Sequence, residues 1–170
     1  VITEATYMHN GKAKKLNFDI SKYSKFKDKI IYIVVDKQPQ NILELTEGES
    51  KKKKSDKLIL NGMARDYFQR ENLIKGIKKA EDDDVILISD LDEIPNLSYL
   101  KNIDINNKIV LFKQKMFYYK LNLYYPDFEW FGSKACRKKN LLSPQWLRNI
   151  KSKKYSKFRI DLIFNKKKYN

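Results

Sequence analysis

Two nearly continuous apolar runs stand out along the chain. Residues 29–35 form the first and end at Asp36, and residues 85–89 form the second. Short runs rich in β-branched residues are typical of strands buried on both faces, as in parallel sheets covered by helices. We expect a further strand over residues 1–6, before a turn.

Apolar residues recur at helical intervals between positions 63 and 77, and Asn61 is placed to cap a helix there. The spacing therefore predicts a helix over residues 61–80. Residues 38–57 contain a glycine and a run of four lysines (51–54), so they are expected to form an exposed loop.

The second half of the chain is dense in aromatic residues. We expect strands at residues 108–112 and 114–123, and the pair Ser143-Pro144 predicts the start of a helix over residues 145–150. Strands alternating with helices indicate an α/β architecture. At 170 residues, the chain has the length of a single domain.

The chain is strongly basic, with 36 Lys and Arg against 21 Asp and Glu, a net charge of +15. Only 5 of these cations are Arg, the residue preferred for phosphate and base recognition, and 31 are Lys. Lys, Asn, Ile and Tyr have A/T-rich codons, so an A/T-rich genome, such as that of a large DNA virus, explains the bias. The charge attracts anionic ligands, but we do not expect nucleic acid as the main ligand.

Other classes are limited by what the sequence lacks. It has no run of eighteen apolar residues, so no membrane-spanning segment is expected. Its one cysteine, Cys136, excludes an internal disulfide framework. Its one histidine, His9, excludes a multi-histidine metal site within the chain.

The second apolar run leads directly into three carboxylates, Asp90, Asp92 and Glu93. Ligands collect at the carboxyl ends of strands in open α/β sheets. Like charges this close repel unless a cation lies among them, and oxygen ligands select Mg²⁺ or Mn²⁺. Pro95 ends the strand and fixes the turn. The alternative is a surface turn with three solvated acids.

Residues 88–95 (Ile-Ser-Asp-Leu-Asp-Glu-Ile-Pro) resemble the signature of glycosyltransferase family 17, the β-1,4-mannosyl-glycoprotein β-1,4-N-acetylglucosaminyltransferases. Further segments match the family pattern in the same order, so that the resemblance covers nearly the whole chain: residues 1–6, 10–16, 29–36, 65–72, 130–133 and 144–148.

The resemblance implies a GT-A-like, Rossmann-like mixed sheet flanked by helices, within one catalytic domain over residues 1–170. It also implies an inverting transfer to a glycan acceptor, as in N-glycan processing, with a UDP-sugar donor (UDP-GlcNAc in the animal enzymes) and Mn²⁺ or Mg²⁺. The family pattern has a strand before Val1 and a segment with Trp and His past Asn170. We therefore expect this chain to be a fragment truncated at both ends.

In such a mechanism Asp92 is expected to coordinate the metal, and Asp90 to bind the donor ribose or a metal-bound water. Glu93 is either a further metal ligand or a supporting residue. An inverting transfer needs a carboxylate that deprotonates the acceptor hydroxyl. Asp127 and Glu129 are the candidates for this base, and the alternative is that they are ordinary loop acids.

Donor binding has three further candidates outside this loop. Arg65, expected on an accessible helix face, and Arg70 are candidates for the diphosphate. Glu4 is a candidate for the nucleotide, with a β-edge acid paired with a lysine as its alternative. Trp130 and Trp146 are either stacking platforms for sugar or base, or core residues.

Two rival functions come from other classes. A phosphotransferase of the haloacid dehalogenase type also places Asp-x-Asp after an apolar strand, but its pattern has Thr or Val where this chain has Ile94. The second rival is an inactive, degenerate module that binds sugars or polyanions.

The compartment is indicated by one further motif. Asn96-Leu97-Ser98 is formally an N-glycosylation acceptor. A glycan beside the expected metal site is incompatible with its use. We therefore expect a cytoplasmic setting, the host cytoplasm for a viral protein, rather than the secretory lumen.

Overall fold

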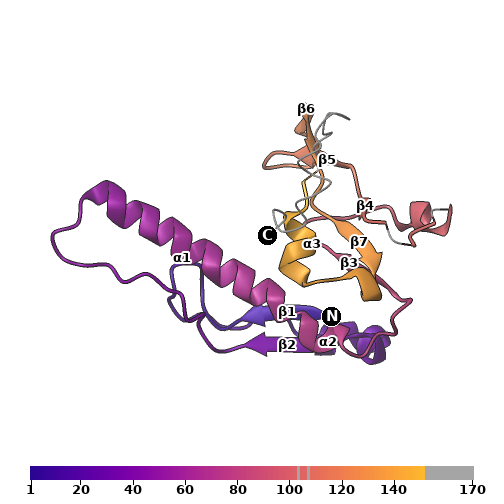
Figure 1. Ribbon diagram of the computed structural model, residues 1–170, viewed down its shortest axis with the longest axis horizontal. Coiled ribbons are helices and arrows are strands. Elements are labelled where there is room, and N and C mark those ends of the chain that lie inside the picture. Colours follow the sequence, from indigo (N-terminus) through magenta and orange to yellow (C-terminus); the bar gives the residue numbers. More distant parts are fainter. Residues whose placement is uncertain (103, 107, 152–170) are drawn as a thin grey trace, which may run out of the picture. The chain divides into compact units, whose positions relative to one another are not determined.

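The computed structural model describes residues 1–102, 104–106 and 108–151, which belong to two compact units (Figure 1). The first unit covers Val1–Lys79 and the second begins at Ala80. Both contain strands and helices, so the α/β class is confirmed, as a set of small sheets with few helices. Among the described residues, no helix is long and apolar enough to cross a membrane.

The first unit is built on two parallel strands, β1 (Ile2–Ala5) and β2 (Tyr32–Val35). The parallel pairing expected from the first apolar run is therefore confirmed, but the expected burial on both faces is wrong, because Val34 is exposed and only Val35 of β2 is buried. A 3-10 helix, η1 (Ile20–Lys29), lies between the strands in sequence. Phe68 packs against a small buried cluster formed by Ala5, Tyr7 and Val35, and this cluster joins the strands to the long helix α1 (Lys51–Glu71).

Helix α1 begins well before the expected start, so the loop predicted over residues 38–57 is wrong from Lys51 onward. Ser50 caps the helix, and its Oγ accepts a hydrogen bond from the Lys53 backbone N–H at 3.3 Å. Lysines in a first turn oppose the helix dipole. Glu49 offsets them, because its carboxylate pairs with Lys53 at 3.3 Å and with Lys57 at 2.5 Å.

Asn61 is not the cap that its sequence position suggested. It is buried in the middle of α1, where its amide bonds the backbone N–H and C=O of Leu43 at 2.7 and 2.8 Å. The helix ends at Glu71 rather than at residue 80, and the short α2 (Ile74–Ile77) follows.

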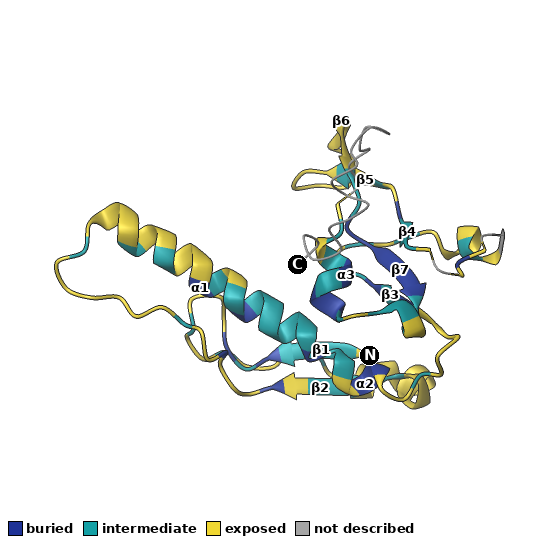
Figure 2. Ribbon diagram, in the orientation of Figure 1, coloured by how far each residue is buried: buried dark blue, intermediate teal, exposed yellow. Residues whose placement is uncertain are grey.

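The second unit contains a three-stranded sheet in the order β3 (Val85–Ile88), β7 (Lys134–Arg137), β4 (Val110–Leu111). Both pairings are antiparallel, so the expectation that the second apolar run lies in a parallel sheet is wrong. An apolar run records burial and not strand direction. Helix α3 (Pro144–Asn149) contacts β3 and β7, and Figure 2 shows β7 as the most buried strand.

A two-stranded antiparallel ribbon, β5 (Gln114–Phe117) and β6 (Tyr124–Trp130), completes the second unit together with η2 (Leu97–Asn102) and η3 (Lys138–Asn140). The strand expected over 114–123 ends early, because the chain turns through Tyr119 at φ +59°. The acids expected in a loop at Asp127 and Glu129 lie on β6 instead.

Candidate functional site

The turn that follows β3 carries all three predicted carboxylates. Ile86 and Ile88 anchor the strand in the core of the second unit, and the chain then folds back, with the Glu93 N–H donating to the Asp90 carbonyl at 3.1 Å. The Ser89 hydroxyl lies 3.1 Å from the Glu93 carbonyl oxygen and closes the same turn. The site loop, residues 89–93, is therefore a closed turn at the end of a buried strand.

Glu93 points into the protein, and its side chain is only 5% exposed. One carboxylate oxygen accepts a hydrogen bond from Trp130 Nε1 and forms an ion pair with the Arg148 guanidinium, both at 2.7 Å. The other accepts from the Asp90 backbone N–H, the Ser133 hydroxyl and Arg148, each at 3.1 Å. Of the two expected roles, the structure favours the supporting one, because both oxygens already have partners.

The ionised form of Glu93 is stabilised by these donors. Burial by itself raises the pKa of the carboxyl group, but the hydrogen bonds from Arg148, the Asp90 N–H and Trp130 outweigh burial. The pKa of Glu93 therefore lies below its ordinary value. The ionised carboxylate of Glu93, together with Asp90, holds the Arg148 guanidinium in place.

Gly132 is required by this arrangement. A Cβ atom at this position would lie 1.6 Å from Glu93 Oε1 and 2.3 Å from Trp130 Nε1. Both atoms belong to buried or half-buried side chains that are held by hydrogen bonds, so neither moves aside cheaply. The absence of a side chain at Gly132 thus allows Trp130 to reach Glu93.

Arg148 links the site loop to α3. It donates to Asp90 Oδ2 at 2.6 Å as well as to Glu93, and its guanidinium lies 5.6 Å from the Trp130 ring centroid. Ser143 fixes the start of α3, since its hydroxyl accepts from the Trp146 N–H at 3.1 Å, as the Ser-Pro pair predicted. The Arg148 side chain is 13% exposed.

Sequence reasoning missed the clamp formed by Trp130, Gly132, Ser133 and Arg148 around Glu93. Only Arg148 could have been singled out from the sequence, because Arg is rare in this chain and each Arg is therefore a candidate for a specific role. Gly132 and Ser133 carry no comparable signal in the sequence.

Asp90 and Asp92 behave differently from Glu93. The Asp90 side chain is 36% exposed, and Asp92 is exposed. Two accessible carboxylates on one turn fit a Mg²⁺ or Mn²⁺ site that is completed by diphosphate and water. Within the described part of the chain, no group of three or more His, Cys, Asp or Glu side chains is arranged to hold a metal by itself.

The two candidate bases lie on β6, the strand that ends at Trp130. Asp127 and Glu129 are both exposed, and Glu129 forms an ion pair with Lys113. Trp130 is half-buried against Glu93 and Arg148, and Trp146 is half-buried on α3. Neither tryptophan is a fully open platform.

The donor-binding candidates of the first unit have intramolecular partners. The expectation that Arg65 lies on an accessible face is wrong: it is buried, and it donates to Gln38 Oε1 at 2.6 Å and to the His9 carbonyl at 2.9 Å. Arg70 pairs with Asp66 at 3.1 Å, one helical turn away. Both arginines therefore make structural contacts within the first unit.

Glu4 is held by donors that tie the strand to the following segment. It accepts from Lys14 at 2.5 Å, from the backbone N–H groups of Asn17 and Phe18 at 2.7 and 3.0 Å, and from the Tyr32 hydroxyl at 2.9 Å. Burial raises its pKa, but these hydrogen bonds outweigh burial and lower the pKa to about 2. This matches the alternative of a strand acid paired with a lysine.

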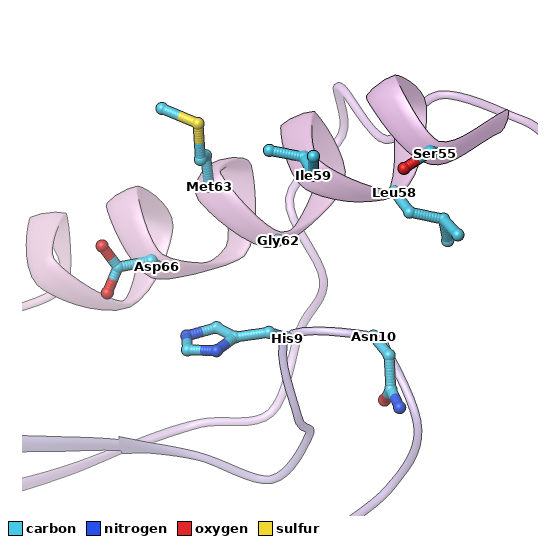
Figure 3. A pocket seen from close by; sticks show the side chains of 8 residues that line it. All are labelled: His9, Asn10, Ser55, Leu58, Ile59, Gly62, Met63 and Asp66. Atoms are coloured by element: carbon cyan, nitrogen blue, oxygen red, sulfur yellow. The ribbon is translucent and has the colours of Figure 1, made fainter. Parts of the chain in front are cut away.

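A pocket of about 530 Å³ also lies in the first unit, between α1 and the turn at His9 and Asn10 (Figure 3). Its α1 wall includes Leu58, Ile59 and Met63, and Asp66 is its one acidic residue. None of the residues predicted for the site lines it. We therefore place the candidate chemistry at the site loop.

Comparisons with known proteins do not identify a family: no protein-family model, curated protein or solved structure matches the chain.

Proposed function

We propose that the chain is a metal-dependent, inverting glycosyltransferase domain with a GT-A-like fold. In this proposal it transfers a sugar, with GlcNAc the favoured one, from a UDP-sugar to a glycan acceptor. One observation carries the proposal: in the site loop, Glu93 is withdrawn and clamped while Asp90 and Asp92 are left accessible. A solvated surface turn has no need of an anchor whose carboxylate is withdrawn from solvent and accepts four hydrogen bonds.

Asp92 and Asp90 are the residues that would hold Mn²⁺ or Mg²⁺ together with the donor diphosphate. When bound, the cation supplies Lewis-acid assistance to the departing diphosphate. Arg148 keeps a positive charge beside Asp90 and fixes the orientation of that carboxylate through Oδ2. Glu93 in turn positions Arg148, so Glu93 acts on the carboxylate of Asp90 through the Arg148 guanidinium.

The acceptor hydroxyl must lose a proton to a carboxylate on the face of the sugar opposite the diphosphate. Asp127 and Glu129 are the candidates, because β6 leads from both of them into Trp130, which contacts Glu93. Of the two, Asp127 is the better candidate, since Glu129 already pairs with Lys113.

The alternative is a sugar-binding module without transfer activity. The ion pair between Asp90 and Arg148 at 2.6 Å supports it, because a cation on Asp90 competes with that contact. Metal dependence separates the two: the transferase needs the cation for nucleotide binding, and a sugar-binding module does not.

The test is calorimetric titration of UDP and UDP-GlcNAc into the full chain, with Mn²⁺ and with a chelator. We expect binding that requires Mn²⁺, is lost in Asp92→Asn, and is retained in Asp82→Asn, an exposed acid elsewhere in the same unit. Folded protein that binds no nucleotide with Mn²⁺, or an Asp92→Asn variant that binds as tightly as the native chain, contradicts the proposal.

A further inference from the structure

A second cavity, of about 550 Å³, lies in the second unit against the β5–β6 ribbon. Small-molecule sites in proteins have this size and combine rings with a few polar groups. The cavity has this composition, because its walls carry the rings of Tyr99, Tyr124 and Phe128 and the polar side chains of Asn96, Gln114 and Lys115. Its lining residues include neither Asp90 nor Asp92 of the site loop.

Two of the three charged residues in the cavity wall neutralise each other, because Lys113 forms an ion pair with Glu129. The third, Lys115, keeps its positive charge, and its Nζ lies 5.7 Å from the Tyr124 ring centroid. What remains for a ligand is a set of aromatic faces with amide and ammonium hydrogen-bonding groups. This combination suits an uncharged polyol better than a polyanion, despite the net charge of the chain.

The aromatic rings of the ribbon form a continuous series. Tyr118 and Tyr125 have centroids 5.5 Å apart, Tyr125 and Phe128 are 6.3 Å apart, and Phe128 and Trp130 are 6.2 Å apart. Except for Trp130, which is half-buried, these rings are exposed. Exposed aromatic patches of this kind mark binding surfaces.

The cavity and the site loop are joined by one chain segment and by one hydrogen bond. Asn96 in the cavity wall lies three residues beyond Glu93, and Glu129 precedes Trp130, whose indole N–H donates to Glu93. A ligand in the cavity therefore lies on the same two segments that hold the proposed donor site.

We propose that this cavity binds a neutral oligosaccharide, with a pyranose face stacked on the rings of Tyr99 and Tyr124 and hydroxyls bonded to Asn96, Gln114 and Lys115. That this saccharide is the acceptor of the transfer rests on the proposed function. The binding of a saccharide does not rest on it. A nucleobase or a second copy of the chain is the competing occupant.

The test uses the full chain without nucleotide or Mn²⁺ and titrates chitobiose, mannobiose, cellobiose and lactose, followed by saturation-transfer NMR and calorimetry. We expect saturable binding of at least one disaccharide, with saturation passing from aromatic protons to the sugar. Removal of one stacked ring in Tyr124→Ala or Tyr99→Ala should weaken it by about fivefold or more. Both rings are exposed, so these variants should fold.

The matched control is Tyr119→Asn, which removes a 99% exposed ring of the same ribbon that does not line the cavity. Asn tolerates the positive φ of this position. We expect this variant to bind as the native chain does. Equal weakening in the control, unchanged binding in both alanine variants, or no disaccharide bound by folded protein overturns the proposal.

Two further outcomes separate this site from the donor site. Disaccharide binding that persists in Asp92→Asn, in protein that binds no Mn²⁺–UDP, supports the saccharide site while it contradicts the proposed function. Selective binding of uridine in the cavity, or self-association that the Tyr124→Ala change abolishes, overturns the saccharide assignment.

Discussion

Two half-buried glutamates, one in each unit, are both held by hydrogen bonds but stabilise different features. Glu4 accepts four hydrogen bonds, three of them from Lys14, Asn17 and Phe18, which lie close to it in sequence. Glu93 also accepts four, and those from Trp130, Ser133 and Arg148 come from segments 37 to 55 residues away. Both carboxylates are withdrawn from solvent and held in the ionised form.

The difference lies in what each glutamate holds in place. Glu4 fastens a strand to its own following segment, and no second acid on that strand is brought to the surface. Glu93 fixes a turn on which Asp90 and Asp92 remain accessible. Each glutamate is therefore a structural element of its unit, and the second one lies on a turn that also carries the exposed Asp92 and the partly exposed Asp90, which is ion-paired with Arg148.

The largest expected effect comes from filling the space that the Glu93 clamp needs. Gly132→Ala should destabilise the second unit by about 3 kcal/mol, because its Cβ overlaps Glu93 and Trp130. Gly48→Ala is the control: its φ of +85° imposes backbone strain of about 1 kcal/mol, but no atom lies within 4 Å of the new Cβ.

Unfolding in guanidinium chloride, monitored through the reactivity of the Cys136 thiol, measures how far Gly132→Ala destabilises the second unit. The same measurement on Gly48→Ala gives the control. Equal stability of Gly132→Ala and native protein would mean that the clamp is not packed as described.

Removing the cation of the clamp should have the next largest effect. Arg148→Met leaves Glu93 buried with fewer donors, and we expect a loss of about 2 kcal/mol. Lys139→Met removes an exposed ion pair with Asp83 and should cost much less. Similar losses in both variants would remove the distinction between an anchoring pair and a surface pair.

The sequence predicted the parts of the site that are local. The apolar run of β3 followed by acids located the site loop, and Ser143-Pro144 located the start of α3. The signals for the start of α1 were also local, since Ser50 is a capping residue and Glu49 lies four residues before Lys53. We missed it because a run of lysines was interpreted as a loop.

The clamp was beyond local reasoning. Glu93 and Arg148 are 55 residues apart, and nothing in either segment alone specifies that they meet. The same holds for the antiparallel pairing of β3 with β7, because an apolar run does not encode the direction of its neighbour. Glu4 was placed on the first strand, but its partner Tyr32 became visible only with the parallel pairing.

A pH titration sharpens the comparison in the first unit. The folded pKa of Glu4 is lowered from 4.5 to about 2, so its contribution is complete above pH 4.5 and is lost as pH falls from there toward 2. Glu4→Gln should be less stable than the native chain at neutral pH and should lose less stability over this range. Urea unfolding at several pH values measures both. A Glu4→Gln curve parallel to the native one contradicts the assignment.

The smallest effect concerns the thiol of β7. Cys136 is fully buried, and burial raises its pKa to about 11. We expect the native protein to react with a thiol reagent at pH 8 only as fast as the second unit unfolds, and unfolded protein to react at once. Rapid labelling of the folded chain would show that the β3-β7-β4 sheet opens freely.

The central claim is that an accessible aspartate of the site loop binds the ligand while a saturated glutamate only holds structure. The most direct test measures Mn²⁺ binding in the presence of UDP by electron paramagnetic resonance, alongside unfolding, for Asp92→Asn and Glu4→Gln. We expect Asp92→Asn to keep its stability and to lose Mn²⁺–UDP binding. We expect Glu4→Gln to lose stability and, where it is folded, to keep Mn²⁺–UDP binding. Undiminished Mn²⁺–UDP binding in folded Asp92→Asn would contradict the central claim.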